Sequence, residues 1–581
     1  MKRYCTTERN IQIILQLLKA NGIKKVVASP GSADIAVVES MQNDDWFEMY
    51  SCIDERSAAY MACGMATETQ EPVVIVCTGA TSSRNYMPGM TEAYYRHLPI
   101  LALTCSLGNR NVGHLVNQVT DRSDPPSDTT KISVYCQAVH SPEDEWDVMV
   151  KANNAILEMK RNGGGPAHIN IEISFANDYS AKEVAPTRVI RRFTKGDNLP
   201  EIVSEKVAIF VGNHSRWDRD LLAEVDKFCE IYNAVVLCDP TSNYKGRYRV
   251  LFPLIADQFE EKTVGSFADL LIHIGDVSSS LIRAKEIWRV CPDGEIRDTF
   301  RKMTNVYQME ELDFFRAYNE GKECKENTQI ESYLKRYQQL YESIPELPLS
   351  NIWVAQKLSK VLPDNSVLHL GIRNSLRSWG YFDIPESVLS YSNTGGFGID
   401  GGVSSLIGAS MVAKDKLFFG VFGDLLFFYD MNSIGNRGIS SNLRILVINN
   451  GLGQEFKNYS CTTSYFLGEE ADSFICAKGH YGNKSKTLIK NFAENLGFEY
   501  LTASSKDEFE KKYMHFVTPE MTDRPMLFEV FTNTEEENQA LEEINTLSAK
   551  SKMMKKAQSV MNSSKLTGVK DSLRKVLRGE Y

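Results

Sequence analysis

The chain has 581 residues, of which 43% are hydrophobic and 24% are charged, as in an ordinary globular protein. Its length allows roughly three or four domains of about 150 residues each. The formal net charge of −10 argues against general affinity for nucleic acid, because a phosphate-binding surface needs a concentrated positive field.

The first unit, residues 10–190, alternates two hydrophobic patterns. Ile11, Ile14, Leu15 and Leu18 have helical spacing, whereas short apolar runs occupy 25–28, 73–76 and 100–103. Strands that alternate with helices at this spacing predict a parallel sheet covered on both faces.

Two further units repeat this alternation. The second has apolar runs at 207–211, 234–237 and 270–274 and ends in the polar stretch 319–327. The third opens with a helical pattern over 352–362 and has apolar runs at 367–370, 417–422, 443–448 and 526–530. The sequence therefore predicts an α/β fold with three doubly wound parallel-sheet domains, at 1–190, 191–345 and 346–545.

The last segment, 546–581, differs in composition. It contains nine Lys or Arg against two acidic residues, Asp571 and Glu580. One helical face carries Leu566, Val569, Leu573, Val576 and Leu577. We predict a basic C-terminal helical tail that packs on the acidic body; a segment for a partner or a membrane surface is the alternative.

The sequence indicates a cytoplasmic protein. Residues 1–25 lack the pattern of a secretory signal, and no apolar run reaches the roughly 18 residues needed to span a membrane. The twelve cysteines are scattered singly, without a CxxC pair, which fits a reducing compartment. We expect them to be buried small apolar residues.

An Asp and an Asn follow two apolar runs of the third unit. Gly423-Asp424-Leu425 comes after 417–422, and Asn449-Asn450-Gly451 comes after 443–448. Because the carboxyl ends of parallel strands form the ligand crevice of an open sheet, these side chains can meet there. Oxygens of Asp424 and Asn450, with the backbone carbonyl of Leu452, suit Mg²⁺ shared with phosphate. A turn after each strand explains either dipeptide alone, but their order and spacing resemble the thiamine-diphosphate enzyme signature.

Such enzymes need one glutamate beside the aminopyrimidine ring of the cofactor, so that the ring can remove the C2 proton. Glu55 fits, because it stands between a short apolar run and a helix of small residues. We expect desolvation there to raise its pKa. The alternative is that Asp54 and Glu55 only stabilise the first turn of a helix through its dipole.

A series of motifs in the same order widens this resemblance. It comprises Ser29-Pro30-Gly31-Ser32, Asp54-Glu55-Arg56-Ser57-Ala58-Ala59, Cys77-Thr78-Gly79-Ala80, Gln118, Tyr391-Ser392-Asn393, Gly398-Ile399-Asp400-Gly401, Gly423-Asp424-Leu425 and Asn449-Asn450. Together they resemble the 2-succinyl-5-enolpyruvyl-6-hydroxy-3-cyclohexene-1-carboxylate synthases, the thiamine-diphosphate enzymes of menaquinone biosynthesis.

The resemblance implies a pyrimidine-binding first domain, a central domain and a pyrophosphate-binding third domain. It implies active sites between the first domain of one subunit and the third domain of another, and therefore a homodimer or homotetramer. Ile399 would lie under the cofactor and hold it bent, and Gln118 would contact the reaction intermediate. The implied cofactor contacts are Glu55, Gly79, Ser392, Asn393, Ile399, Gly423, Asp424, Leu425 and Asn450.

The departures from the family concern the substrate. The synthases hold carboxylated substrates with arginines, but here Ala33-Asp34 follows Ser32, and Thr394 follows Asn393. A third arginine is replaced near Trp379, where Arg373 and Arg377 can take over. We therefore expect substrates other than isochorismate and 2-oxoglutarate, with Ser32 and Arg377 as candidate substrate contacts.

We consider three other positions as candidates. His114 falls where some 2-oxo acid decarboxylases carry paired histidines; it is single here, and we consider it only as a proton donor. Gly212 and Gly275 follow strands of the middle unit, but neither forms GxGxxG, so we expect no nicotinamide or flavin.

The sequence thus predicts a carboligase. It would decarboxylate a 2-oxo acid with thiamine diphosphate and Mg²⁺ and transfer the resulting acyl-anion equivalent to an acceptor, such as a sugar or a specialised metabolite. The alternatives are a simple decarboxylase that releases an aldehyde and a non-catalytic scaffold. The presence of Glu55, Asp424 and Asn450 argues against the scaffold.

Overall fold

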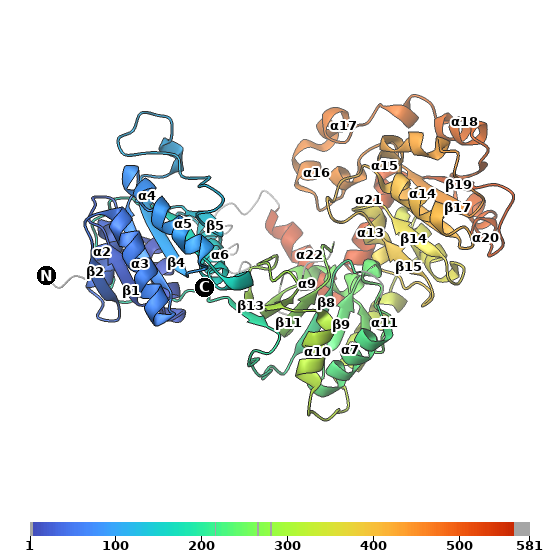
Figure 1. Cartoon of the computed structure of the whole chain (residues 1–581). Helices are drawn as coiled ribbons and strands as arrows, with labels where there is room; N and C mark the ends of the chain where they lie inside the picture. Colours follow the sequence, from blue (N-terminus) through green and yellow to red (C-terminus); the bar gives the residue numbers. More distant parts are fainter. Residues whose placement is uncertain (1–3, 215–216, 264–266, 279–281, 563–581) are drawn as a thin grey trace. The chain divides into compact units, whose positions relative to one another are not determined.

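The computed structural model describes residues 4–214, 217–263, 267–278 and 282–562. Three parallel sheets with helices packed on them make up the fold (Figure 1). This confirms the predicted α/β class with three parallel-sheet domains. The contacts group into two compact units, residues 1–194 with 294–308 and residues 195–293 with 309–581. The four predicted segment boundaries stay a prediction.

The first unit contains a sheet with strand order β2-β1-β3-β4-β6-β5. The strands are β1 (Lys25–Ala28), β2 (Glu48–Ser51), β3 (Val73–Thr78), β4 (Ile100–Ser106), β5 (Ile132–Cys136) and β6 (Ala167–Glu172). The helices are α1 (Arg9–Ala20), α2 (Ile35–Gln42), α3 (Glu55–Thr69), α4 (Thr81–Asn85), α5 (Met87–Tyr95) and α6 (Pro142–Glu158). Two more strands of this unit, β7 (Arg191–Thr194) and β13 (Met303–Gln308), pair in parallel.

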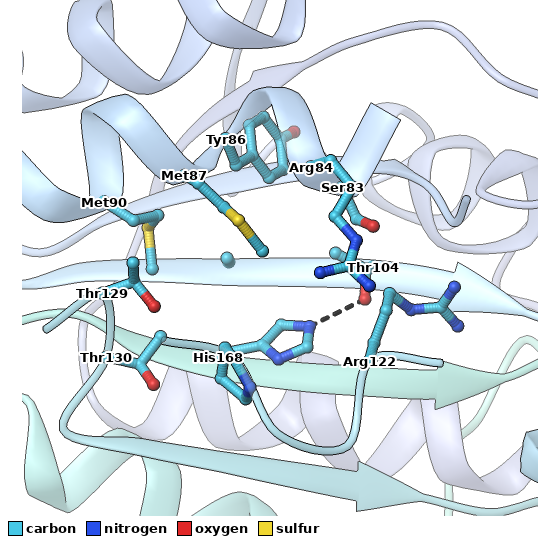
Figure 2. A pocket seen from close by; sticks show the side chains of 12 residues that line it. Ser83, Arg84, Tyr86, Met87, Met90, Thr104, Arg122, Thr129, Thr130 and His168 are labelled. Carbon is cyan, nitrogen blue, oxygen red and sulfur yellow. Dashed lines mark hydrogen bonds between the residues drawn. The ribbon is translucent and has the colours of Figure 1, made fainter. Parts of the chain in front are cut away.

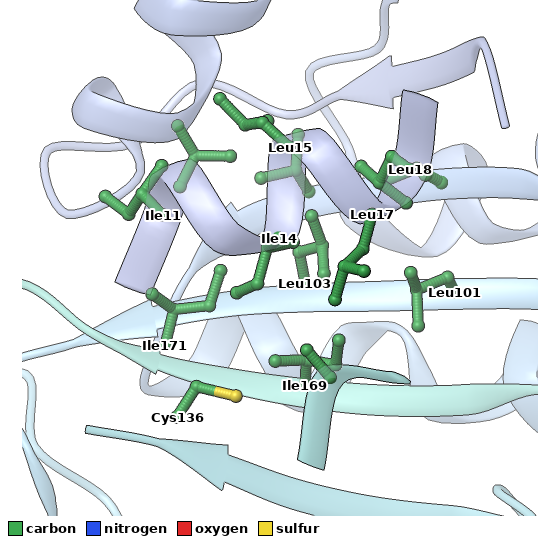
Figure 3. Packing of buried hydrophobic residues seen from close by; sticks show 14 of the residues in the cluster. Ile11, Ile14, Leu15, Leu17, Leu18, Leu101, Leu103, Cys136, Ile169 and Ile171 are labelled. Atoms are coloured by element: carbon green, nitrogen blue, oxygen red, sulfur yellow. The ribbon is translucent and has the colours of Figure 1, made fainter. Parts of the chain in front are cut away.

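Apolar side chains cover both faces of the first sheet. The helical stripe of α1 lies over β4 and β6, where Ile14 and Leu17 approach Leu103 and Ile169 (Figure 3). Small residues of α3 and α5, such as Ala59 and Ala93, pack with Ile75 of β3 in a second cluster. Burial on both faces explains why these strands read as continuous apolar runs rather than alternating ones.

The middle sheet belongs to the second unit, with its strands in the order β10-β9-β8-β11-β12. They are β8 (Val207–Val211), β9 (Val235–Cys238), β10 (Arg249–Leu251), β11 (Ala268–Ile274) and β12 (Ala284–Val290). The helices are α7 (Arg219–Tyr232), α8 (Pro253–Ala256), α9 (Phe259–Thr263), α10 (Glu311–Asn319) and α11 (Gln329–Glu342).

The third sheet, also in the second unit, has strand order β15-β14-β16-β17-β19-β18. Its strands are β14 (Val367–Leu370), β15 (Leu389–Tyr391), β16 (Phe418–Gly423), β17 (Leu443–Asn449), β18 (Glu499–Ala503) and β19 (Met526–Phe531). The helices are α12 (Asn351–Leu358), α13 (Asn374–Gly380), α14 (Gly402–Val412), α15 (Asp424–Tyr429), α16 (Thr462–Leu467), α17 (Ala471–Phe474), α18 (Leu488–Asn495), α19 (Lys506–Glu510), α20 (Tyr513–Phe516) and α21 (Thr534–Asn545).

The predicted basic tail begins with α22 (Ala549–Asn562). Its first turn packs on α9, where the backbone N–H of Glu260 donates to Ser551 Oγ at 3.1 Å. The apolar face that we predicted from Leu566 onward lies outside the described residues. Elsewhere in the described part of the chain, no helix combines the length and the apolar character needed to cross a bilayer.

Candidate functional site

The third sheet has a topological switch point between β14 and β16. The strand order reverses there, because β15 lies on one side of β14 while β16 and β17 follow on the other. Loops that leave such a point in opposite directions open a crevice at the carboxyl ends of the strands. A cavity of about 830 Å³ occupies this place, within the size range of ligand sites. Six of the predicted site residues line it: Arg377, Ile399, Gly423, Asp424, Leu425 and Asn450, together with the predicted metal ligand Leu452.

Asp424 is the buried carboxylate of this cavity. Its side chain follows β16 directly, the residue is 4% exposed, and its Oδ2 accepts a 3.1 Å hydrogen bond from the backbone N–H of Gly451. Burial raises its pKa to about 7, although backbone N–H groups, foremost that of Leu425, act in the opposite direction. It forms no salt bridge with a described residue. A buried carboxyl without a cation nearby is the arrangement that a divalent ion would stabilise.

The turn after β17 brings the other predicted ligands to the same cavity. Gly451 has a φ of 78°, a conformation that glycine adopts without strain, and the chain reverses there. Asn450 Oδ1 accepts from the backbone N–H of Leu452 at 3.3 Å. Asn449 points elsewhere, because its Nδ2 donates to the buried Glu529 at 2.6 Å.

The resulting set of oxygens is hard but contains a single carboxylate. Among the described residues, no group of three or more His, Cys, Asp or Glu side chains could hold a metal ion. The predicted set differs from such a group, since it combines Asp424 with an amide and a backbone carbonyl. It leaves coordination positions for phosphate oxygens, as Mg²⁺ sites commonly do.

Gly423 and Ile399 line the cavity in different ways. A Cβ added to Gly423 would meet no atom within 4 Å, so its backbone faces open space. Ile399 is partly buried and packs against the hydrophobic core under the sheet. Ser392 and Asn393 are not part of the lining. Asn393 Nδ2 instead donates to Gly401 O and Ser405 Oγ, which stabilises the loop after β15.

The two arginines after β14 have different surroundings. Arg377 Nη2 donates to both carboxylate oxygens of Glu455, at 2.9 and 3.1 Å, so this pair already occupies the predicted substrate contact. Arg373 has a φ of 65° and a side chain that is 56% exposed; its Nη1 lies 4.0 Å from Glu455 Oε1, farther than the Arg377 contact, and its guanidinium is 5.1 Å from the Phe397 ring centre. Left-handed backbone is strained for a non-glycine residue, and such strain is typical of functional sites. Arg373 is therefore the better placed of the two to meet an anion in the cavity.

In the first unit, Glu55 begins α3 at the carboxyl end of β2. Asn85 Nδ2 donates to Glu55 Oε2 at 3.0 Å. Burial raises the pKa of Glu55, but hydrogen bonds from Asn85, from its own backbone N–H and from Ser82 outweigh it, and the pKa is lowered. Our expectation of a raised pKa was wrong for the single chain, because the side chain is only partly buried. Asp54 does cap the helix, accepting from Ser57 N at 3.0 Å.

The remaining candidates of the first unit have different surroundings. Ser32, His114 and Gln118 are exposed, and Gln118 has a φ of 61°. Gly79 follows β3, and a Cβ added there would lie 2.7 Å from Arg122 Nη1 and 2.9 Å from the carbonyl oxygen of Cys105. Close packing is therefore a sufficient reason for glycine at this position.

Arg122 also borders a small cavity beneath α5 that contains none of the predicted residues (Figure 2). His168 lies at its base, between Thr104 Oγ1 and Ser133 Oγ, each 2.8 Å from a ring nitrogen. Burial, and then the charge of Arg122, lower the pKa of His168 to about 4. A neutral histidine with both ring nitrogens bonded is a structural one. Sequence reasoning could not place it, since its partners come from separate strands.

Comparison with known proteins identifies relatives along most of the chain. Residues 10–125 match the family described as thiamine pyrophosphate enzyme, N-terminal TPP binding domain. The 2-succinyl-5-enolpyruvyl-6-hydroxy-3-cyclohexene-1-carboxylate synthase of Phocaeicola vulgatus is 30% identical, over 92% of this chain and 98% of its own length. The synthase of Bacteroides thetaiotaomicron is 29% identical with the same coverage. Among solved structures, the thiamine diphosphate-dependent 4-hydroxybenzoylformate decarboxylase of Rhodococcus jostii is 15% identical, over 91% of this chain and 99% of that one, with a TM-score of 0.39.

Proposed function

The chain belongs to the thiamine-pyrophosphate-dependent enzyme family that includes the 2-succinyl-5-enolpyruvyl-6-hydroxy-3-cyclohexene-1-carboxylate synthases, and from this premise we propose a specific reaction. The enzyme decarboxylates a 2-oxo acid and transfers the resulting acyl-anion equivalent to an acceptor. The observation that carries the proposal is the convergence of Asp424, Asn450 and Leu452 on one cavity at the switch point of the third sheet.

The residues of this cavity fit a diphosphate held through Mg²⁺. Asp424, the Asn450 amide oxygen and the Leu452 carbonyl would bind the ion, and the bare backbone at Gly423 leaves space for phosphate oxygens. Burial raises the pKa of Asp424, as expected for a metal-binding carboxylate when no cation is bound to it. Bound thiamine diphosphate would supply a nucleophilic carbon and accept the electrons released with carbon dioxide.

Glu55 is the residue that we propose to exchange a proton with the pyrimidine ring. Its carboxylate is fixed by Asn85 at the carboxyl end of β2 and is only partly buried in the single chain. Covering this edge would desolvate Glu55 and raise its pKa toward the value that proton exchange needs. The apolar wall at Ile399 would support the cofactor, and Arg373 would attract the carboxylate of the 2-oxo acid.

We further propose that the chain associates as a homodimer or homotetramer, as the family resemblance implies. Close in sequence to Glu55, the first unit exposes three large apolar side chains: Ile53 is 82% exposed, Tyr60 48% and Met61 41%. A contact with a second copy of the chain would bury such side chains. Sedimentation of the wild-type protein should give a multiple of the chain mass, and Met61→Asp should shift it toward the monomer. A monomeric wild type would contradict this part of the proposal.

A panel of 2-oxo acids tests the reaction. Wild-type enzyme with thiamine diphosphate and Mg²⁺ should release carbon dioxide from at least one donor and form a new carbon–carbon bond with an added aldehyde. Release of the donor-derived aldehyde alone would instead identify a simple decarboxylase. Glu55→Gln should bind the cofactor but slow exchange of its C2 proton by about 10²-fold or more. Unchanged exchange would remove Glu55 from the mechanism.

A further inference from the structure

Asp34 is a buried carboxyl without an ordinary structural role. It lies just after β1 at the N-cap of α2, the residue is 1% exposed, and neither carboxylate oxygen has a hydrogen-bond partner of normal geometry among the described residues. An Asp at this position usually caps the helix, but its side chain makes no capping bond here. Buried polar groups are nearly always bonded, so the exception requires an explanation.

The carboxyl lines a hollow with room for a ligand. This cavity of about 380 Å³ opens between the carboxyl ends of β1 and β2, with Gly31, Tyr50 and Ser51 among its other walls. A Cβ at Gly31 would lie 2.9 Å from Asp34 Oδ1 and 2.6 Å from Thr78 Cβ. A larger residue at position 31 would therefore clash with the Asp34 carboxyl in its present position. The hollow adjoins β1, which with β3 forms the switch point of the first sheet.

The surroundings of Asp34 raise its pKa. Burial, and to a lesser extent the charge of Glu55, raise the pKa of Asp34 to about 7, which the backbone N–H groups of Asp34 and Gly31 offset only in part. The pKa of Glu55 is shifted in the opposite direction. Asp34 also interacts electrostatically with the thiols of Cys77 and Cys105 and the phenol of Tyr86. Burial raises the pKa values of these groups, so all three are uncharged near neutral pH. Glu39 and Tyr50 are further titratable side chains that line the same hollow.

A buried carboxyl whose pKa lies near neutrality can both give and take a proton at ordinary pH, which is what general acid–base chemistry requires. A merely structural Asp would have gained a hydrogen bond or a cation. No described cation forms a salt bridge with Asp34.

We propose that Asp34 is a further catalytic residue of the proposed reaction, giving a proton to, and taking one from, substrate oxygen atoms in the hollow beside Glu55. This inference rests on the proposed function. When the new carbon–carbon bond forms, the π electrons of the acceptor carbonyl move to its oxygen, which takes the proton of Asp34. When the donor-derived carbonyl re-forms, its hydroxyl loses a proton, and the Asp34 carboxylate takes it up. Asp34 is thus protonated again after these two steps. The proton that converts the donor carbonyl oxygen into this hydroxyl comes from solvent, one for each carbon dioxide released, because a carboxylate leaves as a neutral molecule.

The same carboxyl affects which acceptor fits. Once ionised, Asp34 repels a carboxylate placed in the hollow, whereas a carbonyl or hydroxyl oxygen meets a hydrogen-bond donor or acceptor there. The hollow therefore favours an uncharged aldehyde, ketone or hydroxylated acceptor.

The test compares Asp34→Asn with Asp45→Asn, an exposed acidic residue after α2. The probes are pyruvate, 2-oxobutyrate and 2-oxoglutarate as donors and acetaldehyde as the acceptor. Asp34→Asn should bind cofactor and exchange its C2 proton as the wild type does, but form the carbon–carbon bond about 10²-fold more slowly. It should also lose the limb of the pH–rate profile near pH 7. Asp45→Asn should behave as wild type.

A second measurement does not depend on activity. Carbon-13 NMR of the carboxyl carbons should show a resonance that titrates with a midpoint of about 7 in the wild type and is absent from Asp34→Asn. Bond formation at the wild-type rate in Asp34→Asn, or an Asp34 carboxyl that titrates near 3.8, would overturn the proposal. If the wild type reacts with no donor, the result contradicts the proposed function, and with it the catalytic role of Asp34.

Discussion

The second unit contains two switch points of the same topology, and the described loops at these two points differ. In the middle sheet the order reverses between β8 and β11, as it does between β14 and β16 in the third sheet. After β8 and β11 the first residues of the two loops bond to each other through their backbones: Asp276 N donates to Asn213 O at 2.8 Å, and Gly212 N donates to Ile274 O at 3.1 Å. In the third sheet the corresponding loops diverge around the cavity that contains Asp424.

Both sheets have the topology that can form a crevice at a switch point. The residues of the loops determine whether a ligand can bind there. Both sheets place Gly and Asp after a strand, at Gly275-Asp276 and at Gly423-Asp424. Asp276 is exposed, whereas Asp424 is buried, with its carboxylate held by the turn at Gly451. The middle sheet uses its edge for packing within the unit, since Asn213 Nδ2 donates to Thr394 Oγ1 at 2.8 Å.

The largest predicted contrast is in pH dependence. Because the pKa of Asp424 is raised from 3.8 to about 7, the carboxyl favours folding in its protonated form. That contribution is fully present below about pH 4 and is lost as the pH rises through 7, a change on the order of 4 kcal/mol. Denaturant unfolding of the apoprotein at pH 5 and 8 should therefore show a smaller pH effect in Asp424→Asn than in the wild type. Asp276→Asn should follow the wild type; parallel curves for all three proteins would refute the difference.

Two glycines should respond in opposite ways to the same substitution. A Cβ at Gly212 would lie 1.9 Å from the backbone oxygen of Asp276, whereas one at Gly423 would meet nothing within 4 Å. Gly212→Ala should cost about 3 kcal/mol of unfolding free energy through overpacking. Gly423→Ala should stay within about 0.5 kcal/mol of the wild type but weaken cofactor binding, because the methyl group enters the cavity. Equal destabilisation by Gly212→Ala and Gly423→Ala would contradict the predicted difference in packing around these two glycines.

The smallest effect concerns the polar contact at the middle switch point. Asn213→Ala removes the hydrogen bonds to Thr394 Oγ1 and Ser392 O and should cost about 1 kcal/mol. Thiamine diphosphate affinity, measured by calorimetry, should not change. A loss of affinity comparable to that of Gly423→Ala would mean that the middle sheet contributes to the ligand site.

From the sequence we could predict the strands, and we could predict that Asp424 and Asn450 lie at the carboxyl end of the third sheet, because both predictions depend on neighbouring residues in the chain. Apolar runs such as 443–448 predict strands, and a polar residue directly after a parallel strand must lie at the ligand edge. The sequence did not allow us to find the Arg377–Glu455 pair, the bond from Asn85 to Glu55 or the burial of Asp34. Each depends on which distant segment packs beside the residue, and a single sequence carries no periodic signal for that.

Calorimetric titration of thiamine diphosphate in the presence of Mg²⁺ tests the central claim most directly. The wild type and Asp276→Ala should bind with equal affinity, and omission of Mg²⁺ should weaken both. Asp424→Ala should bind at least about 30-fold more weakly, because losing one partner of a buried charged contact costs about 2 kcal/mol or more. Unchanged, metal-dependent binding by Asp424→Ala would contradict the assignment of the cofactor to this crevice.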